Sequence, residues 1–426
     1  MPQVHSAVLD SGLRLAVVEL PHLHLATVAA FVRVGARFES PEDSGLSHFV
    51  EHMLFRGTEL HPSSRDLAVA VESLGATLDA ETGRDMSILS LAVPPDLVGA
   101  ALAVLAEVIG RPRLAEIELE RALILEELRE DYDEDGNETH AEDIARGLLF
   151  GDHPLGQRII GSEANIRRFT RDDVLRHFRR HYCASNMLIC VAGPVAAEAV
   201  VGAAASALGF IPSGVETTAP APRFDQHRVL YQYERRSGAQ TDVHLLFRSV
   251  PDMDPDYLAS VALLRAIDDG MSTPLHYELC DRRGLAYSVG AAIEPLADVA
   301  LLEVSGTTGQ AKVPDLLAGI LELLGRFRDQ PISAGDLARI KQRYRSDMLA
   351  ALDDSAAMAS WFGGTALYYP PSDLDQRLAG MAAITADDIR AAAERVLRPE
   401  RLAIAVVGPL SRARQGEVRE LAMRWR

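Results

Sequence analysis

Residues 48–52 read His48-Phe49-Val50-Glu51-His52, and the rest of the chain is best interpreted outward from this stretch. On a helix that turns by about 100° per residue, both histidines and the glutamate lie on one face. The opposite face is apolar and consists of Leu46, Phe49, Val50 and Met53. Two imidazoles one turn apart, with a carboxylate beside them, are the minimum set for a zinc ion and the base that activates its water. The alternative is a pair of surface histidines that share this spacing by chance.

A second segment, residues 119–128, offers the third protein ligand that a zinc site usually needs. Glu120 and Glu127 are seven residues apart, which places them about 20° apart around a helix. Leu123 and Ile124 share their stripe, and a carboxylate on an apolar stripe needs a cation or hydrogen bonds to offset its desolvation. Glu126 lies on a different face and is the weaker candidate. Taken alone, the segment also fits a solvated acidic helix face.

Three longer stretches resemble a known family. They are residues 45–58 around the two histidines, His153-Pro154-Leu155-Gly156 with Gly161, and residues 284–289 in the second half. Together with Glu127, 75 residues after His52, they look like the inverzincin peptidases: pitrilysin, insulin-degrading enzyme and the mitochondrial processing peptidase. The resemblance covers nearly the whole chain. It implies an α+β fold of two homologous α/β-roll domains, each a mostly antiparallel sheet flanked by helices.

The resemblance also implies roles for individual residues. His48, His52 and Glu127 would be the ligands of Zn²⁺, Glu51 the general base, and Glu120 a carboxylate just outside the ligand set. In the second half, Tyr287 matches the family's tyrosine on the substrate side and would assist catalysis and substrate binding. The implied activity is that of a zinc endopeptidase that cleaves unstructured peptides in a closed chamber. The alternative class is a non-catalytic assembly subunit related to the core proteins of respiratory complexes.

A short segment, residues 75–82, resembles the edge strand with which this family holds its substrate by strand addition. Asp79, Ala80 and Thr82 are therefore the candidate substrate-binding residues. Asp79 stands where the family usually has Asn, which predicts an altered subsite preference. An ordinary edge strand with no ligand fits the same residues.

One departure from the family concerns its substrate-side arginine, which lies seven residues before the tyrosine. Here that position is Cys280, and a thiol cannot donate a charge-assisted hydrogen bond to a carbonyl. Family members of this half length assemble in pairs, so an intact zinc half with a broken Arg/Tyr pair favours the catalytic subunit of a heterodimer. Its partner would be a homologous half-size subunit that supplies both residues. The alternative is a homodimer in which Arg282 or Arg283 substitutes.

The chain is an internal duplication. Residues 170–174 recur as 385–389, and residues 187–194 recur as 402–409, both at an offset of 215. A constant offset this long indicates two whole domains rather than a solenoid. We predict an N-terminal zinc-binding domain over 1–211, a turn-rich linker over 212–224 and a C-terminal domain without metal ligands over 225–426. Leu263 and Leu264 stand where the first half has His48 and Phe49.

Composition narrows the remaining classes. The 426 residues carry a formal charge of −18, which argues against a nucleic-acid partner. We find neither a long apolar run typical of a membrane span nor a signal peptide, and we therefore expect a cytoplasmic protein without a membrane partner. The three cysteines, Cys183, Cys190 and Cys280, have no metal-ligand spacing and are expected to be reduced thiols that mostly pack in cores.

Overall fold

The computed structural model describes residues 2–134, 136, 139–371 and 373–426. The chain forms two compact units, and each is described by itself. Unit 1 comprises Met1–Glu127, Arg158–Pro220 and Asp347–Leu374. Unit 2 comprises Leu128–Gln157, Ala221–Ser346 and Asp375–Arg426. These units are discontinuous in sequence, whereas the predicted boundaries 1–211, 212–224 and 225–426 describe the duplicated halves and stay a prediction.

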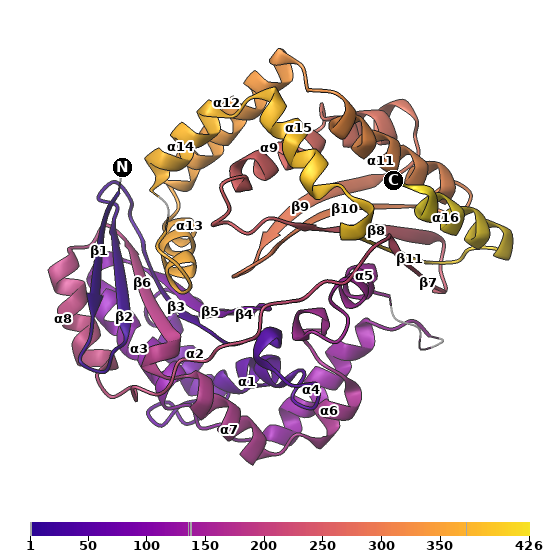
Figure 1. The fold of residues 1–426 in the computed structure, drawn as a ribbon. Helices are drawn as coiled ribbons and strands as arrows, with labels where there is room; N and C mark the ends of the chain where they lie inside the picture. The colour runs from indigo at the N-terminus through magenta and orange to yellow at the C-terminus, as the bar shows by residue number, and fades with distance from the viewer. Residues whose placement is uncertain (1, 135, 137–138, 372) are drawn as a thin grey trace. The chain divides into compact units, whose positions relative to one another are not determined.

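Unit 1 is built on a six-stranded sheet in the order β1-β2-β6-β3-β5-β4 (Figure 1). Its strands are β1 (Gln3–Val8), β2 (Arg14–Glu19), β3 (Ala26–Val32), β4 (Asp79–Thr82), β5 (Ser87–Val93) and β6 (Met187–Gly193). Only the β2–β6 pair is parallel. The helices that begin in this unit are α1 (Leu46–Leu54), α2 (Ser64–Glu72), α3 (Val98–Gly110), α4 (Ile117–Glu130), α6 (Glu163–Arg168), α7 (Arg171–His181), α8 (Ala197–Leu208), α13 (Ser355–Ala359) and the π-helical η6 (Ser360–Gly364).

The central strands of this sheet are apolar on both faces, because both faces are covered. Helices α3 and α8 pack together on one face. The other face carries alternate residues of β2, β3 and β6, among them Val18, Phe31 and Cys190, which pack against Met358 and Phe362 of α13 and η6. This sandwich fixes the sheet that presents β4 at its edge.

Unit 2 repeats the plan with five strands in the order β7-β11-β8-β10-β9. They are β7 (Leu230–Glu234), β8 (Gln240–Ser249), β9 (Ser288–Pro295), β10 (Ala300–Gly309) and β11 (Leu402–Val407). Only β7 and β11 are parallel. The helices that lie wholly or mostly here are α5 (Ala141–Phe150), α9 (Tyr257–Ile267), α10 (Pro274–His276), the π-helical η5 (Tyr277–Arg282), α11 (Val313–Asp329), α12 (Ala334–Ala351), α14 (Leu374–Ala383), α15 (Ala386–Val396) and α16 (Arg412–Arg424).

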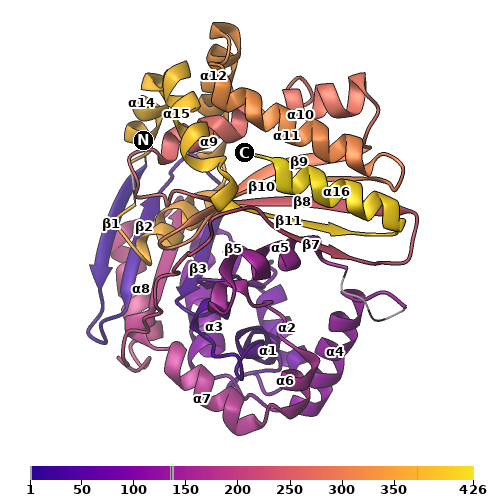
Figure 2. The same cartoon turned by 45° about the vertical axis from the view of Figure 1, so that its right-hand side comes forward.

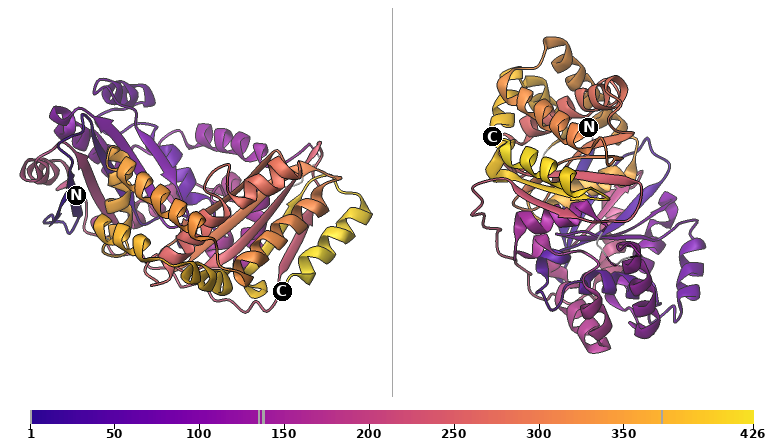
Figure 3. Two further views of the ribbon diagram at one scale, coloured as in Figure 1. Left: turned by 90° about the horizontal axis from the view of Figure 1, so that it is seen from above. Right: turned by 90° about the vertical axis from the view of Figure 1, so that its right-hand side faces the viewer.

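Helix α5 covers one face of the five-stranded sheet and α16 lies on the other (Figure 2). On the α5 side, Ile144 and Leu149 pack against Leu246, Leu301 and Ala405. On the other side α16 lies beside α11 (Figure 3). Two mostly antiparallel sheets flanked by helices confirm the predicted α+β fold.

The offset of 215 holds through the structure, and it uncovers an exchange of helices. Helix α5 lies in the first half of the sequence but covers the sheet of unit 2. Its counterpart at the offset falls on α13 and η6, which lie in the second half but cover the sheet of unit 1. Each half of the sequence therefore contributes helical residues that cover the sheet of the other half. For this reason the two compact units do not correspond to two contiguous segments of the sequence.

Two smaller expectations concern cysteines and membranes. Cys183 and Cys190 are buried, Cys280 is half-buried, and all three are free thiols, as predicted. Within the described part of the chain, every helix is too short or too polar to span a bilayer.

Candidate metal centre

Helix α1 carries the two histidines, and a buried carboxylate anchors its first turn. Glu39 is only 3% exposed and accepts hydrogen bonds from the backbone N–H groups of Gly45 at 2.9 Å and Ser47 at 2.6 Å. Those N–H groups have no partner within the helix, and a carboxylate there is also favoured by the helix dipole. Burial nevertheless raises the pKa of Glu39 to about 7, against the effect of these hydrogen bonds.

Gly45 is required where the chain enters this helix. Its φ of 96° lies in the left-handed region, and a Cβ there would lie 2.6 Å from the carbonyl oxygen of Ile160 and 2.9 Å from Cα of Gly161. The two glycines therefore let two segments touch through their backbones. This contact explains physically why both appear in the stretches quoted from the sequence.

The apolar face of α1 packs as predicted. Leu46, Phe49, Val50 and Met53 are at most 2% exposed, and the Phe49 ring meets Phe169 edge to face at a centroid distance of 6.0 Å. Burial of this face fixes the rotation of the helix, so the histidines and Glu51 are presented on the other side.

The three predicted ligands come together. Candidate donor atoms of His48, His52 and Glu127 all lie within 4.8 Å of one another. The Nε2 atom of His48 is 3.5 Å from one carboxylate oxygen of Glu127, and the Nε2 atom of His52 is 3.4 Å from the other. Among the residues that the structure describes, no other group of three His, Cys, Asp or Glu side chains has this proximity.

These distances fit a zinc ion better than they fit direct hydrogen bonds. Ligand atoms about 2.0–2.1 Å from a tetrahedral zinc lie roughly 3.3–3.4 Å from each other. Strong N–H···O hydrogen bonds are shorter, near 2.9 Å. Two imidazole nitrogens and one carboxylate oxygen are also the donor types of catalytic zinc sites, which keep a fourth position for water.

A second carboxylate holds the ring of His52. Glu120, 3% exposed, lies 3.2 Å from Nδ1 of His52 and accepts a hydrogen bond from Nε of Arg56. A partner on Nδ1 fixes the ring and leaves Nε2 for a metal. Arg56, which lies two residues beyond the end of α1 at Leu54, was not among the predicted site residues.

The pKa values of the two histidines follow from this arrangement. Burial alone would lower the pKa of His52, but Glu120 and Glu127 outweigh it and raise that pKa to about 9. Burial, reinforced by the charge of His52, lowers the pKa of His48 to about 4. The two carboxylates thus create a field that favours a cation at His52, whether that cation is a proton or a metal ion.

Glu51 lies beside the ligands and is held by Thr82. The Thr82 hydroxyl donates a hydrogen bond to the Glu51 carboxylate, and Ser87 donates in turn to Thr82 at 3.3 Å. Burial raises the pKa of Glu51, and the hydrogen bond from Thr82 opposes part of that rise. The side chain of Thr82 is therefore engaged with the expected base.

The other candidate residues on β4 behave differently. Strand β4 is the edge of its sheet next to β5 and contacts α1. Asp79 is exposed and Ala80 half-buried, whereas Thr82 is 7% exposed. An edge strand beside the predicted metal ligands leaves backbone groups free for an incoming strand.

One detail of the predicted glutamate helix was wrong. Ile124 is fully buried, but Leu123 is 47% exposed, so the two do not form one apolar stripe. The side chain of Glu127 is also half-exposed. The pKa of Glu127 is lowered mainly by its contact with His52, so its environment is set by the two histidines rather than by an apolar surface.

The candidate residues of the second half lie in unit 2. Tyr287 is 94% exposed, just before β9. Cys280 lies on η5, and burial, with nearby Asp281 and Asp268, raises the pKa of its thiol. Arg282 and Arg283 are both exposed. Cys280 and Tyr287 therefore belong to unit 2, whereas the three predicted metal ligands belong to unit 1.

A second histidine pair, missed in the sequence, lies on α7. His177 and His181 share the same spacing of four, and their rings lie tilted by 42° at a centroid distance of 4.5 Å. They are at most 6% exposed, and burial lowers both pKa values, that of His181 to about 4. His177 hydrogen-bonds the Ser47 hydroxyl at 3.1 Å. These are neutral packing histidines that support α1 from behind.

Two family models together match most of the chain. A family model described as insulinase, peptidase family M16, matches residues 14–163. A second, described as the peptidase M16 inactive domain, matches residues 168–344. The metal candidates lie in the first match, whereas Cys280 and Tyr287 lie in the second.

Individual relatives cover nearly the whole chain. An uncharacterized zinc protease of Streptomyces coelicolor is 28% identical over 418 residues, 96% of this chain and 90% of its own. A probable mitochondrial-processing peptidase subunit beta of Schizosaccharomyces pombe is 26% identical over 96% of this chain and 92% of its own. In fold, the chain is similar to a protease from Helicobacter pylori, with a TM-score of 0.87, 21% identity, and coverage of 96% of this chain and 100% of that one.

Proposed function

Because this chain belongs to peptidase family M16, we propose that it is a zinc-dependent endopeptidase that cleaves unstructured peptides. One observation carries the proposal: His48, His52 and Glu127 present their donor atoms within 4.8 Å of one another, and Glu51 is held beside them by Thr82. A structural role for these residues would not require a half-exposed carboxylate facing two imidazoles.

In the proposed mechanism the chain's own residues position one proton. A zinc ion held by the three ligands would supply Lewis-acid chemistry, which lowers the pKa of a bound water toward about 7 and polarises a carbonyl. Glu51 would act as the general base that accepts a proton from the attacking water and donates it to the leaving amine. Thr82 fixes the Glu51 carboxylate, while Glu120 and Arg56 fix the ring of His52.

The form of the substrate follows from β4. Its free edge would pair with an extended peptide, which places Asp79 and Ala80 near the substrate backbone. The closed chamber implied by the family resemblance is part of this proposal. Folded proteins should therefore resist cleavage, whereas unstructured peptides of the same sequence should be cut.

The experiment that tests this function combines metal content with turnover. The protein should contain about one zinc per chain by elemental analysis, and His52→Ala should lose most of it. Glu51→Gln should keep the zinc and bind peptide but lose nearly all turnover, since the amide keeps the size of Glu51 but is no base. Near-normal turnover in Glu51→Gln would refute the mechanism.

The partner is a second part of the proposal. Cys280 stands seven residues before Tyr287, where the resembled family has arginine, and one relative is named as a subunit. We propose that a homologous half-size subunit supplies the missing Arg/Tyr pair, so that the isolated chain has weak activity. A missing charge-assisted donor would cost about 2–4 kcal/mol, or roughly 30- to 1000-fold in rate.

Cys280→Arg tests this partner directly, because the protein alone should then gain activity if homodimers form. Full activity of the unmodified chain, with no effect of Cys280→Arg, would overturn the heterodimer and favour Arg282 or Arg283. The absence of an arginine at position 280 also favours a second candidate function, that of a non-catalytic assembly subunit. A zinc-free protein that stays inactive with every half-size homologue would support that candidate.

A further inference from the structure

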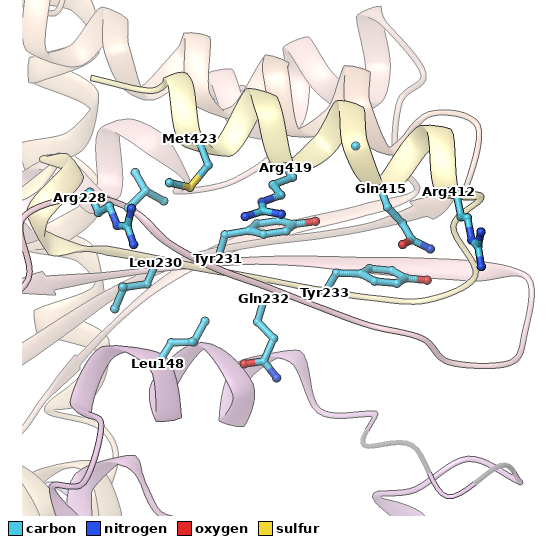
Figure 4. A pocket seen from close by; sticks show the side chains of 12 residues that line it. Leu148, Arg228, Leu230, Tyr231, Gln232, Tyr233, Arg412, Gln415, Arg419 and Met423 are labelled. Atoms are coloured by element: carbon cyan, nitrogen blue, oxygen red, sulfur yellow. The ribbon is translucent and has the colours of Figure 1, made fainter.

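A pocket of about 750 Å³ lies in unit 2, at the free edge of its sheet. We call it the β7 pocket (Figure 4). The residues on which the argument rests are Leu148 of α5, Tyr231 and Gln232 of β7, Arg412 and Arg419 of α16, and Arg228. Strand β7 forms its floor, with α5 on one side and α16 on the other.

The duplication shows which element is missing from this pocket. In unit 1 the counterpart of β7 is β2, and β1 pairs with β2 as an antiparallel outer strand. At the offset of 215 the counterpart of β1 is residues 218–223, which include Pro220 and Pro222. Residues 212–229 form no strand, because proline cannot donate to a ladder. Unit 2 therefore has five strands where unit 1 has six, and β7 keeps an open edge.

The walls of the pocket are cationic and their charges are not neutralised. Arg412 and Arg419 are seven residues apart, so they share one face of α16. These two and Arg228 are exposed and form no ion pair within the described part of the chain. On other faces of the same helix, Arg414 pairs with Glu417 at 3.3 Å and Arg424 pairs with Glu420. The pocket therefore carries positive charge, although the protein as a whole has a net charge of −18.

The pocket is also lined by a tyrosine whose hydroxyl group has no hydrogen-bond partner. The hydroxyl of Tyr231 is buried and has no hydrogen-bond partner, although a buried hydroxyl normally has one. The neighbouring Tyr233 hydroxyl is satisfied, since it donates to the Gly408 carbonyl at 2.7 Å and accepts from the Leu410 N–H at 3.1 Å. Figure 4 shows Tyr231 on the α16 side, beside Arg419.

We propose that the β7 pocket binds an extended acidic segment of the peptide substrate, which adds to β7 as the sixth strand that this unit lacks. The segment would lie antiparallel to β7, as β1 lies against β2. Its backbone would pair with the free edge of β7, and its acidic side chains would reach Arg412, Arg419 and Arg228. That the peptide is a substrate rests on the proposed function; the binding itself does not.

The test measures binding in the full-length Glu51→Gln variant, so that no peptide is consumed. The probe is a fluorescent eight-residue peptide of alternating Glu and Val, followed by anisotropy at low salt. Arg412→Glu combined with Arg419→Glu should weaken binding by about tenfold or more, because two favourable charge contacts become repulsive. The matched control is Arg414→Glu, on the same helix but engaged with Glu417, and it should change affinity by less than about twofold.

Two further measurements separate strand addition from simple charge attraction. Hydrogen exchange of the amides of Leu230–Glu234 should slow when the peptide binds, and N-methylation of alternate peptide amides should abolish binding. Equal affinity in the double variant, or no protection of β7 with peptide bound, would overturn the proposal. Because these readouts need neither zinc nor turnover, a failed peptidase assay would leave them interpretable, and their failure would leave the peptidase proposal standing.

Discussion

Thr82→Val is the substitution that most sharply separates two roles of one residue. The sequence places Thr82 among the substrate contacts, whereas in the structure its hydroxyl donates to Glu51. Valine has nearly the same shape but no hydroxyl, so the packing of this buried position changes little. The matched control is Thr82→Ser, which keeps the donor and removes only a methyl group.

The expected magnitude follows from the hydrogen bond that is lost. Thr82 is 7% exposed, so water cannot readily replace its hydroxyl. A hydrogen bond to a charged acceptor contributes about 1.5–3 kcal/mol. If Glu51 needs this contact to take its proton, kcat should fall by roughly 10- to 150-fold. Zinc content should stay at the wild-type level, because Thr82 bonds to Glu51 and Ser87 rather than to a ligand.

Steady-state kinetics on an unstructured peptide, with zinc measured on the same samples, gives the answer. A fall in kcat with unchanged KM, rescued in Thr82→Ser, would support the role in holding Glu51. A rise in KM alone would instead support the substrate-binding role predicted from the sequence. Unchanged kcat in Thr82→Val would refute the reasoning about Glu51.

Three further predictions test the surroundings of the site and the second unit. Glu120→Gln should weaken zinc affinity by about 10- to 100-fold in a chelator competition assay, because the Nδ1 side of His52 loses its carboxylate; unchanged affinity would argue against that role. Gly45→Ala should lower both the melting temperature and the zinc content, because a Cβ would lie 2.6 Å from the Ile160 carbonyl oxygen; a wild-type melting curve would contradict the clash. Burial raises the pKa of the Glu303 carboxyl group from 4.5 to about 7. The folded state therefore binds the carboxyl proton of Glu303 more tightly than the unfolded chain does. This difference contributes about 3 kcal/mol to the free energy of unfolding below pH 4.5, and the contribution is lost as the pH rises to about 7. Glu303→Gln should therefore gain stability relative to wild type between pH 5 and pH 8 in calorimetric melts, and a pH-independent difference would count against it.

Much of the fold was predictable because local patterns and packing agree. The helix predicted around His48, Glu51 and His52 forms as α1 (Leu46–Leu54), with its apolar face buried, and the repeats at the offset of 215 mark equivalent elements in both units. The exchange of α5 with α13 and η6 was not predictable. The sequence of α5 shows that this helix has an apolar face. It does not show on which of the two sheets that face packs, and the exchange depends on that choice.

The site divides in a similar way. Helical periodicity alone places His48, Glu51 and His52 together, and it buries Phe49 on the far side. It gave no means of choosing Thr82 as a partner of Glu51, because that contact joins a strand edge to a helix across a fold that has to exist first. The burial of Glu39 beneath the first turn of α1 is equally non-local. Such contacts belong to the tertiary structure rather than to any segment.

The second half has buried apolar side chains at the positions where the first half has its predicted metal site. Where the first half has His48, Glu51 and His52, the second has Leu263, Ala266 and Ile267, all at most 6% exposed. Apolar side chains gain free energy on burial, whereas imidazoles and carboxylates pay for desolvation unless they are paired. The first half offsets that cost with Arg56, Glu120 and Thr82, a set of partners that a purely structural helix would not need. The presence of both the costly residues and their partners in the first half therefore supports the proposed zinc site.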